Sequence, residues 1–108
     1  MIIEIAELTI DVERADAFEQ AVASCAPLFR AAKGCRSMAL QRVIEDPTRY
    51  HLLVGWDSVE DHMVHFRESE AFQSWRAAVS GFFVAPPTVV HGETRAHFFG
   101  ATPRSPAP

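Results

Sequence analysis

Apolar residues recur at strand-like spacing in four stretches of the chain. Residues 2–10, IIEIAELTI, form a β-branched, partly alternating run that suits a pleated surface. Two further runs, CRSMALQRVI (35–44) and RYHLLVGW (49–56), are joined by EDPT, which is typical of a hairpin loop. The fourth run, TVVHGETRAHF (88–98), follows two prolines, which lack the amide protons that a sheet interior requires. The pattern predicts four strands.

Helical spacing replaces this alternation between the first two strands. A helix over roughly residues 12–32 is predicted, with Asp11 as its N-terminal cap and Gly34 as its left-handed stop. Pro27 has no amide to donate, so we expect a bend or a break just before it. The apolar face consists of Phe18, Val22, Cys25 and Phe29.

A second helical region follows the third strand. Ser58 is a favourable cap, and a second cap at Ser69 predicts two helices with a corner between them. An apolar loop, SGFFVAPP, then leads to the last strand. The predicted apolar face of the first helix is Val59, His62, Met63 and Phe66, and that of the second is Phe72, Trp75 and Val79.

The element order β-α-β-β-α-β predicts a ferredoxin-like α+β fold, in which both helices cover one face of an antiparallel sheet. We expect one domain over residues 1–98 and a Pro-rich, disordered tail over 99–108. In the third strand Trp56 and its alternating partners face one way, whereas Leu53 lies on the other side, which is also apolar. The second sheet face therefore needs a cover, and in so short a chain we expect a second copy to supply it.

Composition excludes several classes of partner. The formal net charge is -4 and basic residues are not clustered, so binding to nucleic acid is not expected. No apolar run approaches the roughly 20 residues of a membrane span and no secretory leader is visible, so we expect a soluble cytoplasmic protein without membrane contact. Cys25 and Cys35 are too few and too far apart for a zinc or disulfide motif, and we interpret them as structural thiols.

His62 is the candidate catalytic residue. It is the polar exception on an apolar helical face, where burial would lower its pKa and keep the imidazole able to accept a proton. The other interpretation is a hydrogen-bonded core histidine. His65 follows one turn later, but no third ligand is placed by the sequence, so no metal site is predicted.

Aromatic residues and a further histidine are candidates for contact with a substrate. Trp56, Phe66 and Trp75 could be flat walls for an aromatic ligand or ordinary core residues. His65 is a further candidate for substrate contact, and His91 on the last strand could reach a pocket or a subunit contact. Arg67 and Arg76 could anchor an anionic group, although solvated helix faces also carry arginines.

Three stretches carry a family resemblance: PLFRAAKGCRSMALQR, YHLLVGWDSVEDHMVHFRESEAF and PPTVVHGE. In their order and spacing they resemble the antibiotic-biosynthesis-monooxygenase family of the dimeric α+β barrel superfamily, over roughly residues 1–97. The resemblance implies a homodimer with its sheets packed face to face and a pocket between sheet and helices in each subunit. It also implies chemistry on polycyclic aromatic quinols without flavin or metal, or, in relatives, degradation of haem.

The family's usual functional asparagine has no counterpart, because the chain contains no asparagine. The corresponding first-strand stretch offers Glu4, Ala6 and Glu7, and the tryptophan of the haem-degrading relatives falls near His65 or Phe66. The leading hypothesis is therefore a cofactor-independent monooxygenase that deprotonates a small quinol-like aromatic with a histidine base. The alternatives are a non-catalytic module that binds a small apolar metabolite and, less favoured, a haem-degrading enzyme.

Overall fold

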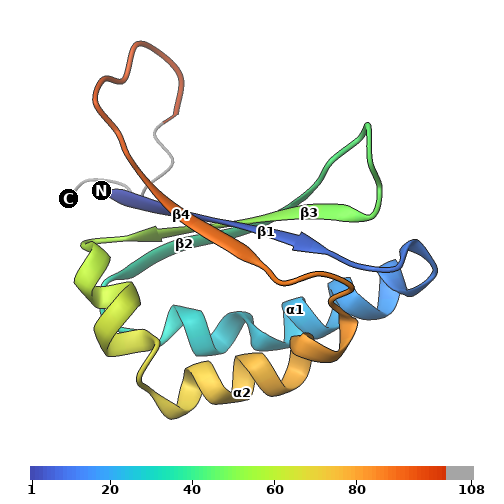
Figure 1. The fold of residues 1–108 in the computed structure, drawn as a ribbon. Helices are drawn as coiled ribbons and strands as arrows, with labels where there is room; N and C mark the ends of the chain where they lie inside the picture. Colours follow the sequence, from blue (N-terminus) through green and yellow to red (C-terminus); the bar gives the residue numbers. More distant parts are fainter. Residues whose placement is uncertain (102–108) are drawn as a thin grey trace.

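The computed structural model describes residues 1–101, which form an antiparallel sheet with helices on one face (Figure 1). The strand order is β2-β3-β1-β4, as a ferredoxin-like fold requires, and the predicted fold class is confirmed. The strands are β1 (Ile2–Thr9), β2 (Cys35–Arg42), β3 (Arg49–Trp56) and β4 (Thr88–Glu93), and the α-helices are α1 (Ala15–Arg30) and α2 (Glu70–Val79). Three shorter helical segments are η1 (Val12–Arg14), η2 (Asp61–Phe66) and η3 (Ser80–Phe82).

Helix α1 follows the predicted apolar face but not the predicted interruption. Asp11 Oδ1 accepts a hydrogen bond from the Glu13 amide at 3.0 Å, and η1 leads directly into α1. Of the two predicted outcomes, a break before Pro27 is wrong, because α1 continues to Arg30, and a bend stays a prediction. Pro27 and Ala23, whose carbonyl loses its helical donor, are both exposed, so water can hydrate that carbonyl. The buried face continues past the proline, with Phe18, Val22, Cys25 and Phe29 all in the core.

Gly34 lies between α1 and β2 in the left-handed conformation, with φ of 76°. The predicted left-handed conformation is therefore confirmed, but Gly34 does not end the helix, because α1 ends at Arg30, four residues earlier. A Cβ atom at this position would collide with the Asp61 carboxylate. Gly34 is thus required both by its backbone angle and by the close approach of η2.

The second helical region is two helices with a corner, as predicted. Ser58 Oγ accepts from the Asp61 amide at 3.1 Å, and Ser69 Oγ accepts from the Phe72 amide at 3.3 Å. Segment η2 is a π-helix, in which the Arg67 amide donates to the His62 carbonyl five residues earlier, at 3.0 Å.

The π-helical turn changes which side chains of η2 are buried. His62 and Phe66 are buried as expected, but the predicted burial of Val59 and Met63 is wrong, since they are 42% and 38% exposed. Because the turn of a π-helix is wider than that of an α-helix, Met63, three residues before the buried Phe66, does not share its face. The prediction from the sequence used α-helical spacing throughout this segment.

Strand β4 is shorter than predicted. It ends at Glu93, because Glu93 pairs with Ile2 at the first residue of β1 and no strand extends further. Phe98, the last residue of the expected strand, is 87% exposed. Residues 99–101 of the predicted tail have no helix or strand, and residues 102–108 lie outside the described part of the chain.

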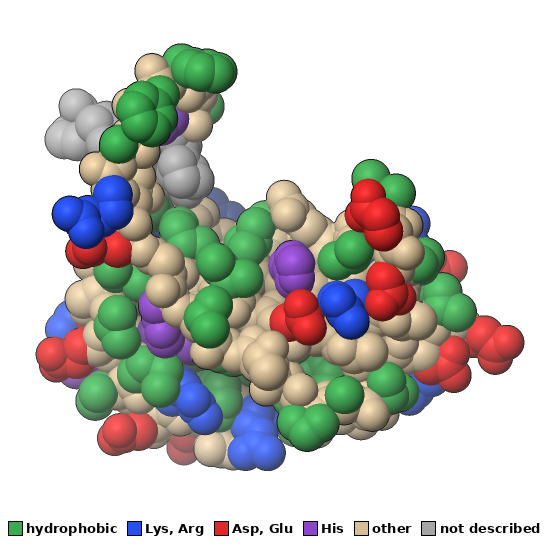
Figure 2. All heavy atoms as spheres, turned by 45° about the horizontal axis from the view of Figure 1, so that its top comes forward, with side chains coloured by type: hydrophobic (Ala, Val, Ile, Leu, Met, Phe, Trp, Pro, Cys, Tyr) green, Lys and Arg blue, Asp and Glu red, His purple; other side chains and the backbone are tan. Residues whose placement is uncertain are grey.

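The sheet face opposite the helices is open in the single chain. Paired residues of an antiparallel sheet point to the same side, so the pairings place one apolar row across all four strands on this face: Val90, Ile5, Leu53 and Ala39. Figure 2 shows hydrophobic side chains gathered over the sheet beside charged residues and a histidine. The predicted two-sided apolarity is confirmed.

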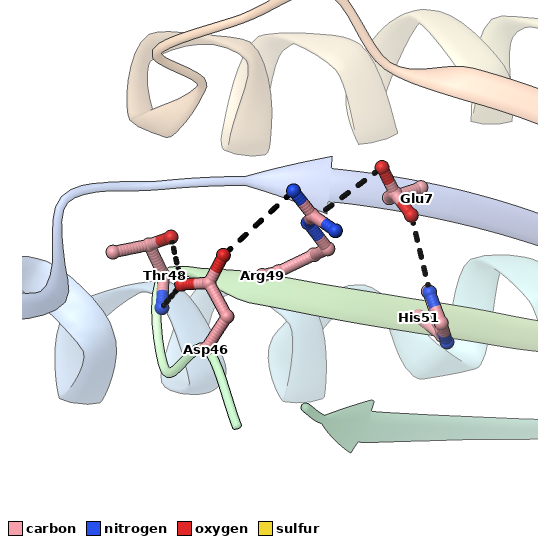
Figure 3. A network of polar contacts seen from close by, with 5 residues as sticks. All are labelled: Glu7, Asp46, Thr48, Arg49 and His51. Atoms are coloured by element: carbon pink, nitrogen blue, oxygen red, sulfur yellow. Dashed lines mark hydrogen bonds and ion pairs between the residues drawn. The ribbon is translucent and has the colours of Figure 1, made fainter. Parts of the chain in front are cut away.

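A polar network lies beside this apolar row on the open face (Figure 3). Glu7 on β1 contacts Arg49 at 3.7 Å and His51 at 3.4 Å, both on β3. Arg49 also contacts Asp46, which accepts a hydrogen bond from the Thr48 hydroxyl at 2.6 Å. Within residues 1–101, no helix is long and apolar enough to cross a membrane.

Candidate functional site

The sheet face under the helices carries a carboxyl group among apolar residues. Glu4 is in phase with Ala6 and Leu8 on β1, and all three point to the helices and are buried. The register sets His91 of β4 directly beside Glu4 on the same face. Trp56 of β3 is the diagonal neighbour of Glu4, because Glu4 pairs with Val54.

Segment η2 places His62 over this pair. The imidazole Nε2 lies 3.2 Å from Glu4 Oε1, and Nδ1 lies 2.8 Å from His91 Nε2. The ring also stacks on Trp56, with ring centroids 5.2 Å apart and an interplanar angle of 21°. Glu4, His62 and His91 therefore form a row of side chains, which we term the Glu4–His62–His91 row, held from three separate elements.

Trp56 fixes the carboxyl end of the row. Its indole Nε1–H donates to Glu4 Oε1 at 3.0 Å, and Trp56 itself has no exposed surface. An indole is a donor only, so it stabilises the carboxylate form of Glu4 and holds its orientation. Glu4 thus has a hydrogen-bond donor in a site from which water is largely excluded.

Burial moves the proton affinities of Glu4 and His62 in opposite directions. It raises the pKa of Glu4 to about 7, an effect that the Trp56 hydrogen bond and the Arg67 charge only partly counteract. It lowers the pKa of His62 to about 4, with further contributions from His91 and Arg67. Near neutral pH, His62 is therefore neutral, and Glu4 is close to its midpoint and can both take up and release a proton.

The distances in the row fit two arrangements of its protons. With Glu4 ionised, His62 Nδ1 accepts from His91 Nε2–H, and the His62 proton resides on Nε2, toward the carboxylate. With Glu4 protonated, the carboxyl proton faces His62 Nε2, and Nδ1–H donates to His91 instead. One proton entering at Glu4 thus reverses the hydrogen bond at the other end of the row.

A cavity of about 510 Å³ opens beside the row, between the sheet and α2. Glu4, His62 and Arg67 line one end. The cavity is also lined by residues of β1, β3 and α2 and by the loop that follows α2. Its apolar lining includes Leu8, Leu52, Val79 and Phe83.

The model of the antibiotic biosynthesis monooxygenase family matches residues 1–78 of the chain. This chain belongs to that family. The uncharacterized protein YczJ of Bacillus subtilis is 36% identical over 91 residues, which are 84% of this chain and 96% of that protein.

Solved structures of the family have the same fold. A crystal structure from Bordetella bronchiseptica, assigned to the antibiotic biosynthesis monooxygenases, is 45% identical with a TM-score of 0.85, covering 88% of this chain and 97% of that one. SnoaB from Streptomyces nogalater, a cofactor-independent oxygenase, has a TM-score of 0.76 over 89% of this chain and 94% of its own, at 14% identity. At that identity the likeness concerns the fold alone.

In this family member, the residues predicted to form the site are only partly brought together. His62 and Trp75 line the cavity, and His91 reaches it through His62. Trp56 and Phe66 lie behind the lining, where Phe66 contacts Phe29 and Phe72 in the core. His65 does not line the cavity: its side chain is 42% exposed and lies 3.5 Å from Glu60.

Glu4 is not among the site residues predicted from the sequence, which places it only where relatives of the family carry another residue. Its alternation with Ala6, Leu8 and Ile10 nevertheless puts it on the buried face. A carboxyl group in phase with core residues is the signal that could have identified it.

The side chains of Glu4, His62 and His91 follow one another in a line and do not surround a common position where a metal ion could bind. Among the described residues, no group of three His, Cys, Asp or Glu side chains is arranged to hold a metal ion. Absence of metal and flavin from the purified protein remains a prediction from the sequence.

Proposed function

We propose that this chain is a monooxygenase that acts without a bound cofactor on a small, electron-rich aromatic compound of the quinol type. Family membership supports the reaction class. The observation that carries the proposal is the Glu4–His62–His91 row at one end of a cavity whose walls are largely apolar and aromatic. Such a cavity suits a flat hydrophobic ligand, and the row supplies a proton acceptor beside it.

Removal of a phenolic proton is the step that the row performs. Both nitrogens of His62 already face protein groups, so the proton enters at the Glu4–His62 contact and is shared along the row. The Glu4 carboxylate takes up the proton as the base, and His62 shares it along the row by moving its own proton from Nε2 to Nδ1. Because the pKa of Glu4 is raised to about 7, the carboxyl is matched to work near neutral pH.

The resulting phenolate is electron-rich enough to reduce dioxygen directly. One electron passes from the phenolate to dioxygen, which gives a phenoxyl radical and superoxide. These two radicals then join at a ring carbon, and protonation gives a hydroperoxide. Loss of water leaves a carbonyl group, so that a hydroquinol and dioxygen give a hydroxyquinone and water. Atoms and electrons balance without an external reductant.

Oxygen uptake with 1,4-naphthohydroquinone tests the proposal. We expect catalysed uptake above the spontaneous oxidation, rising with pH through about 7 as Glu4 ionises. His62→Ala should lower the rate by about 10²-fold. His65→Ala is the matched control, because His65 belongs to the same segment, η2, but does not line the cavity. This variant should retain the wild-type rate.

Two results would contradict this function. Equal rates for His62→Ala and His65→Ala would remove the row from the reaction. Binding of the quinol without any turnover, and unaffected by His62→Ala, would instead identify a module that sequesters a small apolar metabolite.

A homodimer is part of the proposal. The apolar row through Ile5 and Leu53 is continuous across four strands, and a second copy with the same row is complementary to it. The cavity lies on the other face of the sheet, so a dimer of this kind leaves the site open to ligand. Cytoplasmic location remains an expectation from the sequence.

A further inference from the structure

The wall of the cavity that η2 and α2 provide carries two arginines in addition to its aromatic residues. Arg67 at the end of η2 and Arg76 in α2 both line the cavity. Phe72 lies between them: its ring is 5.2 Å from the centre of the Arg67 guanidinium, and it precedes Arg76 by four residues, one helical turn. Two positive charges thus flank one aromatic ring along the wall.

Arg76 differs from Arg36 and Arg49, which are engaged in ion pairs. Arg36 is paired with Asp57 at 2.7 Å, and Arg49 contacts Glu7 and Asp46. Within residues 1–101, Arg76 forms no ion pair with any carboxylate. Its charge is therefore available to a ligand in the cavity.

The two arginines also differ in their relation to the row. Arg67 is close enough to Glu4 and His62 to influence the pKa of both groups, whereas Arg76 influences neither. A negative group bound at Arg67 would lie near Glu4, whose ionised form would repel it. A negative group at Arg76 would avoid this repulsion.

We infer that the substrate is an aromatic acid, with its phenolic hydroxyl directed to the Glu4–His62 contact and a carboxylate bound by Arg76. The inference rests on the proposed function for the orientation of the hydroxyl, but the carboxylate site is defined by the arginines alone. Arg67, which acts on both Glu4 and His62, stabilises the phenolate as it forms. Arg76 is thus a specificity-determining residue that selects acids over neutral phenols.

Calorimetric titration with two matched ligands tests this without turnover. 1-Hydroxy-2-naphthoate and 1-naphthol share the ring system and the hydroxyl, and only the first carries a carboxylate. We expect the acid to bind about tenfold more tightly than the naphthol at low salt, and the preference to shrink in high salt. Arg76→Gln should remove this preference and leave the affinity for 1-naphthol within about twofold.

Arg30→Gln is the control, because Arg30 is an exposed arginine of α1 outside this cavity, and it should bind both ligands like the wild type. Thermal unfolding of each variant verifies that it is folded. Equal affinities of the wild type for the two ligands, or an Arg76→Gln variant that keeps the preference, would overturn the inference. A preference for the acid without oxygen uptake by its 1,4-dihydroxy analogue would leave the carboxylate site standing and remove the proposed reaction.

Discussion

Glu4 and His62 have opposite linkage to pH although the same burial acts on both. Burial favours the uncharged form of each group, so the folded state holds the Glu4 proton up to about pH 7 and releases the His62 proton down to about pH 4. As pH falls from 7 to 4, Glu4 contributes increasing stability, since its folded pKa is raised. Over the same interval His62 loses its contribution, since its folded pKa is lowered. In the wild type the two effects offset each other.

Single substitutions should separate these effects. In Glu4→Gln only the His62 effect remains, so acidification from pH 6.5 to 4 should lower the free energy of unfolding, relative to the wild type, by on the order of 2 kcal/mol. In His62→Gln, acidification from pH 7 to 4.5 should raise it by a similar amount. Urea denaturation at several pH values measures both. Parallel pH profiles for the two variants would contradict opposite linkage.

How far the sequence predicts the site also depends on individual residues. The burial and neutral state of His62 followed from its place on an apolar face, and Trp75 followed in the same way. The pairing of Glu4 with His91 could not be foreseen, because it depends on the register between the first and last strands, whose sequences are about 80 residues apart.

Among the connections between elements, the turn at Gly34 is the most constrained. Gly34→Ala places a side chain both in the left-handed region and against the Asp61 carboxylate of η2. We expect this change to lower the free energy of unfolding by about 1–3 kcal/mol. Equilibrium unfolding in urea measures the loss.

Gly81→Ala is the matched control for this turn. Gly81 has no positive φ, and no atom lies within 4 Å of the position of an added Cβ. Its substitution should change stability by less than about 0.5 kcal/mol. A Gly34→Ala variant as stable as Gly81→Ala would show that the turn adapts to a side chain.

The sequence predicts a helix or strand correctly where local residue spacing determines it. It does not where contacts with neighbouring elements determine the geometry or the end of the element. The first three strands and both serine caps follow from short-range pattern and hydrogen-bonding chemistry. The π-helical turn of η2 does not, and Met63 within it is exposed although the sequence predicts it in the core. The end of β4 is set by its partner, since pairing stops where β1 begins.

At the scale of the whole molecule, the open sheet face is the main feature that a single chain leaves unexplained. Leu53→Glu places a charge in the middle of the apolar row on this face. We expect the wild type to sediment as a dimer at micromolar concentration and Leu53→Glu as a monomer, because a dimer would bury that charge. Analytical ultracentrifugation measures both.

Val64→Glu is the control for the effect of placing a glutamate at any exposed hydrophobic position. Val64 is 43% exposed on η2, in the helical layer on the other side of the sheet, and its variant should remain a dimer. A monomeric wild type, or a dimeric Leu53→Glu variant, would place the contact elsewhere.

Because Trp56 stacks on His62, its fluorescence should report on formation of the fold. An indole that lies on an imidazole and donates to a carboxyl group should change its emission when either partner changes protonation. Replacing Trp75 with Phe leaves Trp56 as the single tryptophan of the chain, so that excitation at the red edge of indole absorption reports on it alone. Because the partners of Trp56 come from β1 and η2, its native emission should appear only once these segments have met, and should then follow the titration of the buried row.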